Sequence, residues 1–137
     1  KKEYEMIALA RKMNLFTTVY VTSPEQAVEM AKAGADSIIA HSGTTIGGSI
    51  GVTDAVCTMD DAVKLTQDII DAACTVRKDI IFLTHGGPIC TPADAAYVNE
   101  RTDAVGFVGA SSLERLAVED SLTDLTAKFK KIAVARK

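Results

Sequence analysis

Two histidines, the only ones in the chain, stand at equivalent places in the sequence. His41 follows the apolar run S-I-I-A and His85 follows I-I-F-L-T, and each is succeeded by glycine within two residues. An imidazole titrates near neutral pH, so each side chain could act as a general acid or base, or polarise a carbonyl or phosphoryl oxygen. A structural histidine that bonds a neighbouring loop is the alternative, and no H-x-H or H-x-x-x-H spacing supports a metal site. His41 and His85 are the candidate catalytic residues.

Small residues near the ends of two apolar runs could hold an anion. After a strand, glycines let backbone N–H groups approach a ligand, and a helix N-terminus offers free N–H groups and a favourable dipole. The alternatives are a tight turn before Pro88 and a simple capping box made by Ser111 and Glu114. The candidate anion-binding residues are Gly86, Gly87, Gly109, Ala110, Ser111 and Ser112.

A glycine-rich stretch, residues 43–57, lies between these motifs. It is neither a Walker loop nor a Rossmann fingerprint, because no G-K-[ST] follows and the glycine spacing is wrong. Its length suits a lid over a site, with Gly47, Gly48 and Ser49 at its centre, and a flexible surface loop is the other interpretation.

Short apolar runs alternate with helical patterns along the whole chain. We expect strands at 15–21, 37–40, 80–84 and 105–108. We expect helices at 3–13, 24–33 and 58–76, from residue 92 onward, and at 112–117 and 120–135. Four strand–helix units with one-sided helices predict half of a (β/α)₈ TIM barrel, and an open flavodoxin-like sheet is the alternative.

Residues 1–137 therefore form one α/β domain that corresponds to the C-terminal half of a TIM barrel. A half-barrel leaves two strand edges unpaired, and such edges pair with another segment. We expect the partner to be a missing N-terminal half-barrel or a second chain, with a homo-oligomer as the favoured assembly. In TIM barrels the active site lies at the C-terminal ends of the strands, and both histidines are expected at such ends.

The composition narrows the possible partners and locations. The net charge is −3, with no basic stripe and 5% aromatic residues, which argues against nucleic-acid binding. No apolar run has the length of a membrane span. The three cysteines, Cys57, Cys74 and Cys90, form no C-x-x-C pair, which favours a reducing, cytoplasmic environment. The three tyrosines, Tyr4, Tyr20 and Tyr97, have no evident partner in the sequence pattern.

Three runs occur in the order A-G-A-D-S-I-I-A-H-S-G-T-T-I-G-G-S-I-G, H-G-G-P-I and G-F-V-G-A-S-S-L-E-R-L. Together they resemble the C-terminal part of the TIM-barrel family described as phosphoenolpyruvate-hydrolase-like, also described as a predicted TIM-barrel signal-transduction protein. A related segment ends larger proteins of the plant virus-resistance type.

The resemblance implies an oligomeric barrel related to the phosphoenolpyruvate- and pyruvate-binding barrels. It implies a small phosphorylated or carboxylated substrate, such as phosphoenolpyruvate, and hydrolysis or a lyase-like step. Better-understood relatives bind a divalent metal such as Mg²⁺ through carboxylates, and the strand ends here carry no matching acidic cluster, so any such ligands are expected outside this chain. A non-catalytic ligand-sensing or signal-transduction module is the alternative function.

Overall fold

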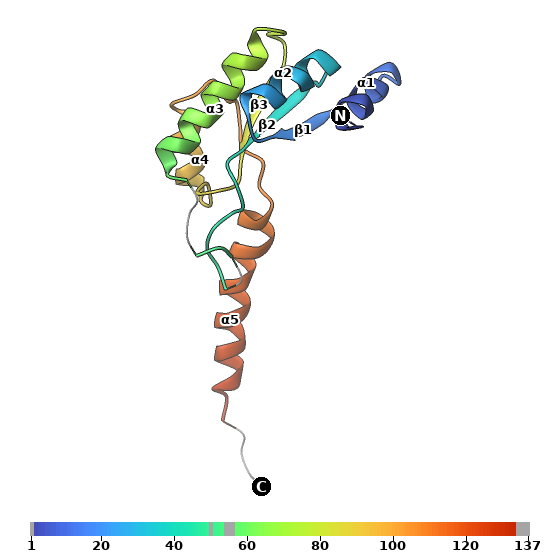
Figure 1. The fold of residues 1–137 in the computed structure, drawn as a ribbon. Helices are drawn as coiled ribbons and strands as arrows, with labels where there is room; N and C mark the ends of the chain where they lie inside the picture. Colours follow the sequence, from blue (N-terminus) through green and yellow to red (C-terminus); the bar gives the residue numbers. More distant parts are fainter. Residues whose placement is uncertain (1, 50, 54–56, 134–137) are drawn as a thin grey trace.

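Three parallel strands and the helices around them make up the structure, a computed structural model that describes residues 2–49, 51–53 and 57–133. Figure 1 shows α2, α3 and α4 gathered beside the sheet, and α5 running away from it. In chain order the elements are α1 (Lys2–Lys12), β1 (Thr18–Val21), α2 (Pro24–Ala33), β2 (Ser37–His41), α3 (Met59–Cys74), β3 (Ile81–His85), α4 (Pro92–Asn99), the π-helical turn η1 (Ser112–Leu116) and α5 (Ala117–Lys130).

Local capping signals fix where several helices begin and end. The Thr58 side chain accepts a hydrogen bond from the Asp61 N–H, and the Asp61 carboxylate accepts one from the Thr58 N–H, which completes a capping box at α3. Thr91 and Asp94 repeat this arrangement at α4. Gly34 ends α2 with a φ of 98°, in the left-handed region that glycine adopts without strain.

The sheet has the order β1-β2-β3, and all neighbouring strands are parallel. Alternate side chains point toward the helices and form the main core with α2 and α3, because successive residues of a strand face opposite sides of the sheet. The strand residues of this core are Val19, Val21, Ile38, Ala40 and Phe82, and the helix residues include Ala27, Met30, Ala31, Ile69, Ile70 and Ala73.

The opposite face of the sheet is uncovered in part. The strand register places Tyr20 beside Ile39 and Leu83, and places His41 beside His85 at the strand ends. Tyr20 keeps 48% of its surface exposed, although it is a large aromatic side chain on the strand β1. In a closed barrel this face would point inward, so the chain leaves open a surface that further strands could cover.

The expected fourth strand is reduced to a single bridge, between Thr84 and Phe107. The segment 105–108 does run parallel to β3, since Val105 N–H donates to Phe82 O, Thr84 N–H to Gly106 O, and Val108 N–H to Thr84 O, each at 2.9 Å. The pairing is short and Val105 is 75% exposed, so only an isolated bridge forms. The prediction of four complete strand–helix units is therefore not confirmed, because the described residues form a sheet of three strands.

The end of the chain also differs from the two helical segments expected at 112–117 and 120–135. A π-helical turn, η1, runs directly into α5 as one continuous helical stretch.

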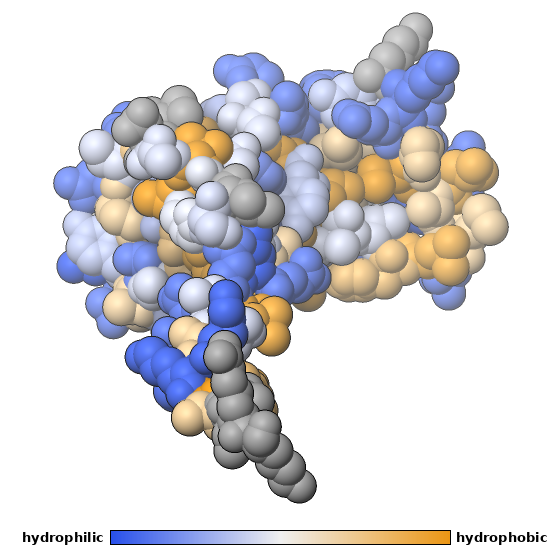
Figure 2. Space-filling model, turned by 90° about the horizontal axis from the view of Figure 1, so that it is seen from below, coloured by the Kyte–Doolittle hydropathy of each residue, from blue (hydrophilic) through white to orange (hydrophobic). Residues whose placement is uncertain are grey.

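Figure 2 shows hydrophobic surface gathered over the side where α1 and β1 lie. Several exposed apolar side chains belong to this region: Met6, Leu9, Met13, Leu15 and Phe16. Within the described residues, no helix combines the length and apolar character needed to cross a bilayer.

Candidate functional site

The two histidines lie side by side at the carboxyl ends of neighbouring strands. His41 ends β2 and His85 ends β3, and the strand register pairs the two residues directly. Their ring centroids are 4.9 Å apart. The structure therefore brings together the two side chains that the sequence singled out, and their catalytic role stays a prediction.

His85 is fixed by a short hydrogen bond from its ring. Its Nδ1 lies 2.7 Å from the carbonyl oxygen of Val108, and a carbonyl oxygen can only accept, so Nδ1 carries a proton. In the neutral ring the other nitrogen, Nε2, then has a free lone pair. Only 8% of the residue is exposed. His85 is thus arranged to accept a proton at Nε2.

His41 has the opposite arrangement. The backbone N–H of Gly43 donates to His41 Nδ1 at 3.1 Å, so this nitrogen carries no proton and Nε2 does. Burial lowers the pKa of His41 below its ordinary value, and the neighbouring His85 lowers the pKa further. His41 is therefore held neutral, with an Nε2–H that can donate.

Tyr20 is a third ring at this site that the sequence did not indicate. Its centroid lies 5.4 Å from that of His41 in an edge-to-face contact and 5.0 Å from that of His85. Phe107 lies on the far side of His85, with centroids 6.5 Å apart. The signal that could have found Tyr20 is strand alternation, because Val19 and Val21 are buried against the helices and Tyr20 must face the other way.

Glycines allow the two strand-end loops to interlock. Gly43, Gly86 and Gly87 have φ values of 111°, 76° and 57°. A Cβ on Gly86 would collide with the carbonyl oxygen of Gly43, and one on Gly87 with that of Ser42. The Gly87 N–H donates to Gly43 O at 2.7 Å. Gly87 thus supports the loop that holds His41, and its own N–H is already bonded rather than free for an anion.

The segment 109–112 follows Val108, whose carbonyl oxygen bonds the His85 ring. Within the part of the chain that the structure describes, the N–H groups of Gly109, Ala110 and Ser111 donate to no protein acceptor. The adjoining carbonyl of Val108 is the one that accepts from His85, so these N–H groups follow directly after the histidine contact. This arrangement suits an anion, whose oxygens would accept from them.

The expected alternative, a capping box at this helix start, does not form. Ser111 has αR dihedral angles and its side chain makes no capping bond. The Leu113 and Glu114 N–H groups instead both donate to Ala110 O. The Ser112 hydroxyl is buried without a partner among the described residues. The buried Ser112 hydroxyl is thus a polar group whose hydrogen-bonding capacity the described residues leave unused.

The glycine-rich stretch is attached to the C-terminal helix where the structure describes it. Arg115 donates to Gly47 O at 2.8 Å and pairs with Glu119 at 3.3 Å. The Ser49 N–H donates to Glu119 at 2.7 Å, and this bond is the main cause of the lowered pKa of the Glu119 carboxyl. Gly48 lies against the same two side chains. The remaining expected lid positions, 50 and 54–56, lie outside the described residues.

Two cysteine thiols donate hydrogen bonds to backbone carbonyls of the same loops. The Cys57 thiol donates to Ser42 O at 3.2 Å, and the Cys90 thiol donates to Ile46 O at 3.3 Å. Burial is the main cause of the raised pKa of each thiol. A thiol with a raised pKa is a poor nucleophile, so these cysteines stabilise the loops rather than supply chemistry.

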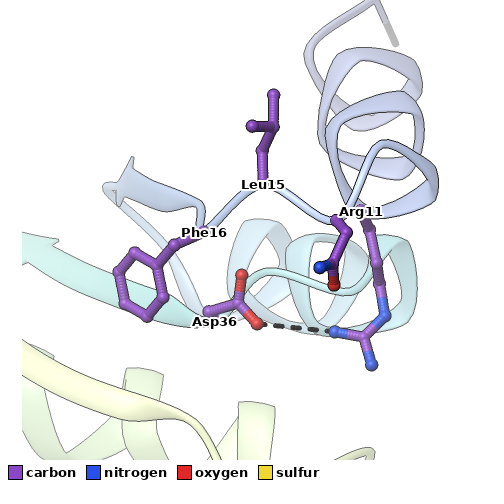
Figure 3. A pocket seen from close by; sticks show the side chains of 5 residues that line it. Arg11, Leu15, Phe16 and Asp36 are labelled. Carbon is purple, nitrogen blue, oxygen red and sulfur yellow. Dashed lines mark hydrogen bonds and ion pairs between the residues drawn. The ribbon is translucent and has the colours of Figure 1, made fainter.

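A surface cavity of about 460 Å³ lies at the opposite end of the sheet (Figure 3). Its lining residues precede β1 and β2, and its main feature is an ion pair of Arg11 and Asp36 at 3.5 Å. Thr17 donates to Asp36 through its N–H at 2.9 Å and its hydroxyl at 3.1 Å, and these bonds contribute to a lowered pKa of Asp36. The cavity thus surrounds a contact that fastens α1 to the sheet, away from the histidines.

The side chains around the two histidines do not supply enough ligands for a metal ion. Among the described residues, no three histidine, cysteine, aspartate or glutamate side chains come close enough to hold an ion. The Nδ1 atoms of both histidines are engaged by backbone groups. The residues present do not fit a magnesium site, and no step is assigned to a metal.

Comparison with known proteins gives a consistent result. A family model described as phosphoenolpyruvate hydrolase-like matches residues 1–132. The chain is 50% identical over 133 residues to two Solanum lycopersicum proteins, the ToMV susceptible protein tm-1(GCR26) and the ToMV resistance protein Tm-1(GCR237). The match covers 96% of this chain and 18% of each relative, so the chain spans less than a fifth of their length.

One solved structure shares the fold at low sequence identity. It is the N-acetylmannosamine-6-phosphate 2-epimerase of Clostridium perfringens, with a TM-score of 0.55 and 12% identity. The match covers 91% of this chain and 49% of that chain. The protein therefore has an α/β fold with a parallel sheet and TIM-barrel-like structural neighbours.

Proposed function

Because the chain belongs to the phosphoenolpyruvate hydrolase-like family, we propose that it supplies the acid–base half of an active site for a small phosphorylated or carboxylated metabolite. Phosphoenolpyruvate is the substrate class that the family description favours. One observation carries the proposal: His41 and His85 lie together with opposite ring protonation, one offering a proton at Nε2 and the other a lone pair.

This pair suits the hydrolysis of an enol phosphate. His85 Nε2 takes a proton from water, whose oxygen attacks phosphorus. The bond between phosphorus and the enol oxygen breaks with its electron pair on that oxygen, which takes the proton back from His85 Nε2 while the neutral His41 ring donates a hydrogen bond to it from Nε2–H. Inorganic phosphate and the enol of pyruvate result, and the enol becomes pyruvate by moving a proton to carbon. General acid–base catalysis of this kind contributes about 10²–10⁴-fold.

The backbone supports a place for the anion beside this pair. The free N–H groups of Gly109, Ala110 and Ser111 follow the carbonyl that fixes His85. Gly86 brings the other strand-end loop close to the His41 ring, since its ideal Cβ would lie 3.5 Å from His41 Cε1. In this proposal the phosphate or carboxylate binds at 109–112 with the hydroxyls of Ser111 and Ser112, and Gly86 leaves room for it.

The rest of the barrel is part of the same proposal. The chain aligns with 49% of a TIM-barrel-like chain and leaves one face of its sheet open around Tyr20. Further strand–helix units, from a longer polypeptide or a second chain, would cover this face and complete the substrate pocket. Any carboxylate ligands of a divalent metal would come from those units.

Turnover tests the catalytic proposal directly. The purified protein is incubated with phosphoenolpyruvate, and ³¹P NMR follows the appearance of inorganic phosphate. We expect the substitutions His41→Gln and His85→Gln each to lower the rate by about 10²-fold or more. The control is Tyr97→Phe, which removes a hydroxyl that bonds Asp60 on the outer helices. Equal rates for all variants would remove the histidines from the mechanism.

A ligand-sensing module is the second candidate, favoured by the attachment of the glycine-rich loop to α5. Through Arg115 and Glu119, a change in the loop reaches the C-terminal helix directly. A sensor would bind phosphoenolpyruvate, seen as a rise in melting temperature, and release no phosphate. An enzyme would do both, so the two measurements together separate the candidates.

A further inference from the structure

A second cavity, which we call the α4 cavity, lies between α4 and the start of η1. Its volume is about 440 Å³, which is within the range of small-molecule sites in proteins. One wall is a single face of α4, because its residues follow one another at helical spacing of three and four positions. These residues are Pro92, Ala95, Ala96 and Asn99.

The other wall brings an aromatic ring and a leucine to the cavity. Phe107 packs beside the small core that contains Ala95, and Leu113 keeps 65% of its surface exposed. An ideal Cβ on Gly109 would lie 2.6 Å from Leu113 Cδ1 and 3.2 Å from Phe107 Cε1, so these two side chains meet over this glycine. A molecule in the α4 cavity would therefore contact apolar groups on both sides.

Two polar atoms in the lining residues have unused hydrogen-bonding capacity. Asn99 Oδ1 and Ser112 Oγ are buried and have no partner among the described residues. An amide oxygen can only accept, and a buried acceptor without a donor destabilises the protein. The final torsion of an asparagine side chain has a broad preference, so the amide can turn toward a ligand in the cavity. The Asn99 oxygen thus calls for a ligand that donates.

The charge of the lining residues restricts the ligand further. None of the described residues that line the α4 cavity is charged. The Cys90 thiol at its edge already donates to Ile46 O at 3.3 Å. An ion placed here would lose its water without gaining an opposite charge, so a neutral molecule is favoured.

From the unpaired Asn99 oxygen and the uncharged apolar walls, we propose that the α4 cavity binds a neutral aromatic molecule that carries an N–H or O–H donor. The ring lies between Phe107 and the α4 face, and the donor bonds Asn99 Oδ1. The Phe107 and His85 ring centroids are 6.5 Å apart, so the cavity neighbours the histidine site without including it.

Titration with indole tests whether the cavity binds such a molecule, because indole has two fused rings, one N–H and no charge. NMR of the full chain with ¹³C-labelled alanine methyl groups should show saturable shifts at Ala95 and Ala96. Ala96→Leu fills part of the cavity and should raise the dissociation constant about tenfold or more. The matched control is Ala93→Leu, which adds the same side chain at an exposed position of α4 outside the cavity lining and should not change it.

A comparison of two ligands tests the hydrogen bond to Asn99. Benzofuran has the shape of indole but an oxygen in place of the N–H, so the wild-type protein should bind it about fivefold or more weakly. Asn99→Leu should remove this difference and bind both ligands about equally. Circular dichroism checks that each variant folds, and the wild-type comparison does not depend on any variant.

Three results would overturn the proposal. The first is a wild-type chain in which indole causes no saturable shift at Ala95 and Ala96. The second is an equal effect of Ala96→Leu and Ala93→Leu on indole binding. The third is a wild-type chain that binds benzofuran as tightly as indole. The readout is binding rather than turnover, and His41 does not line the cavity, so the histidine mechanism can fail without affecting these results.

Discussion

The substitution Gly86→Ala tests how the two strand-end loops hold the histidine site. Gly86 has a φ of 76°, which costs a residue with a Cβ about 1–2 kcal/mol. Its new methyl group would also collide with the carbonyl oxygen of Gly43, a backbone atom that cannot rotate away. Displacing that carbonyl costs a further amount typical of overpacking, about 1–3 kcal/mol. We therefore expect the free energy of unfolding to fall by about 2–5 kcal/mol.

The chain offers a matched control in Gly47→Ala. Gly47 has a similar φ of 85°, but among the described residues its Cβ would meet nothing nearer than a Leu116 methyl group at 3.7 Å. This variant should show the backbone cost alone, about 1–2 kcal/mol. Urea unfolding followed by circular dichroism gives both values. Equal losses for the two variants would refute the reasoning that the loops interlock through Gly86 and Gly43.

The same variant has a consequence at the site. Gly43 donates its N–H to His41 Nδ1, so moving Gly43 weakens the bond that fixes the His41 ring. We expect the ¹⁵N chemical shifts of His41 to move toward a mixture of tautomers in Gly86→Ala and to stay unchanged in Gly47→Ala. If the shifts stay unchanged in a destabilised Gly86→Ala protein, the packing of these loops does not determine the orientation of the His41 ring.

Four further outcomes are expected. Burial lowers the pKa of His41, so the unfolded state binds a proton at this residue more readily than the folded state does. The urea midpoint should therefore fall as the pH drops below about 6.5, and it should fall less steeply in His41→Gln. Tyr20→Leu should raise the pKa of His41 in an NMR titration by admitting water, whereas Tyr20→Phe should not. Arg115→Gln should speed hydrogen exchange at the Ser49 N–H. Asp36→Asn should weaken the attachment of α1 to the sheet, lowering the free energy of unfolding measured in urea by about 1–3 kcal/mol.

The alternation of strands and helices could be predicted because each helix carries its own signals. Thr58 with Asp61 and Thr91 with Asp94 form the capping boxes that their spacing indicates, and Gly34 ends α2 as expected. These interactions span a few residues and need no knowledge of the rest of the fold. The segment 105–108 has the composition of a strand, but it pairs with β3 through a single bridge, because strand formation depends on tertiary pairing as well as on propensity.

The histidine pair could be predicted for a different reason. His41 and His85 each follow an apolar run, and parallel strands end at the same edge of the sheet, so their proximity follows from topology. Tyr20 could not be placed there without the register, which pairs it with Ile39, two residues before His41. The contacts of Arg115 with Gly47 and of Glu119 with Ser49 join residues that are 68 and 70 positions apart in the sequence. No local sequence pattern indicates such contacts.

The protonation of the two rings follows from single backbone bonds, so it is the most direct test of the proposed acid–base pair. A long-range ¹H–¹⁵N NMR spectrum at neutral pH distinguishes the two nitrogens of each imidazole. The structure predicts a proton on Nε2 of His41 and on Nδ1 of His85. The same tautomer in both rings, or a His41 ring that carries both protons at neutral pH, would contradict the account.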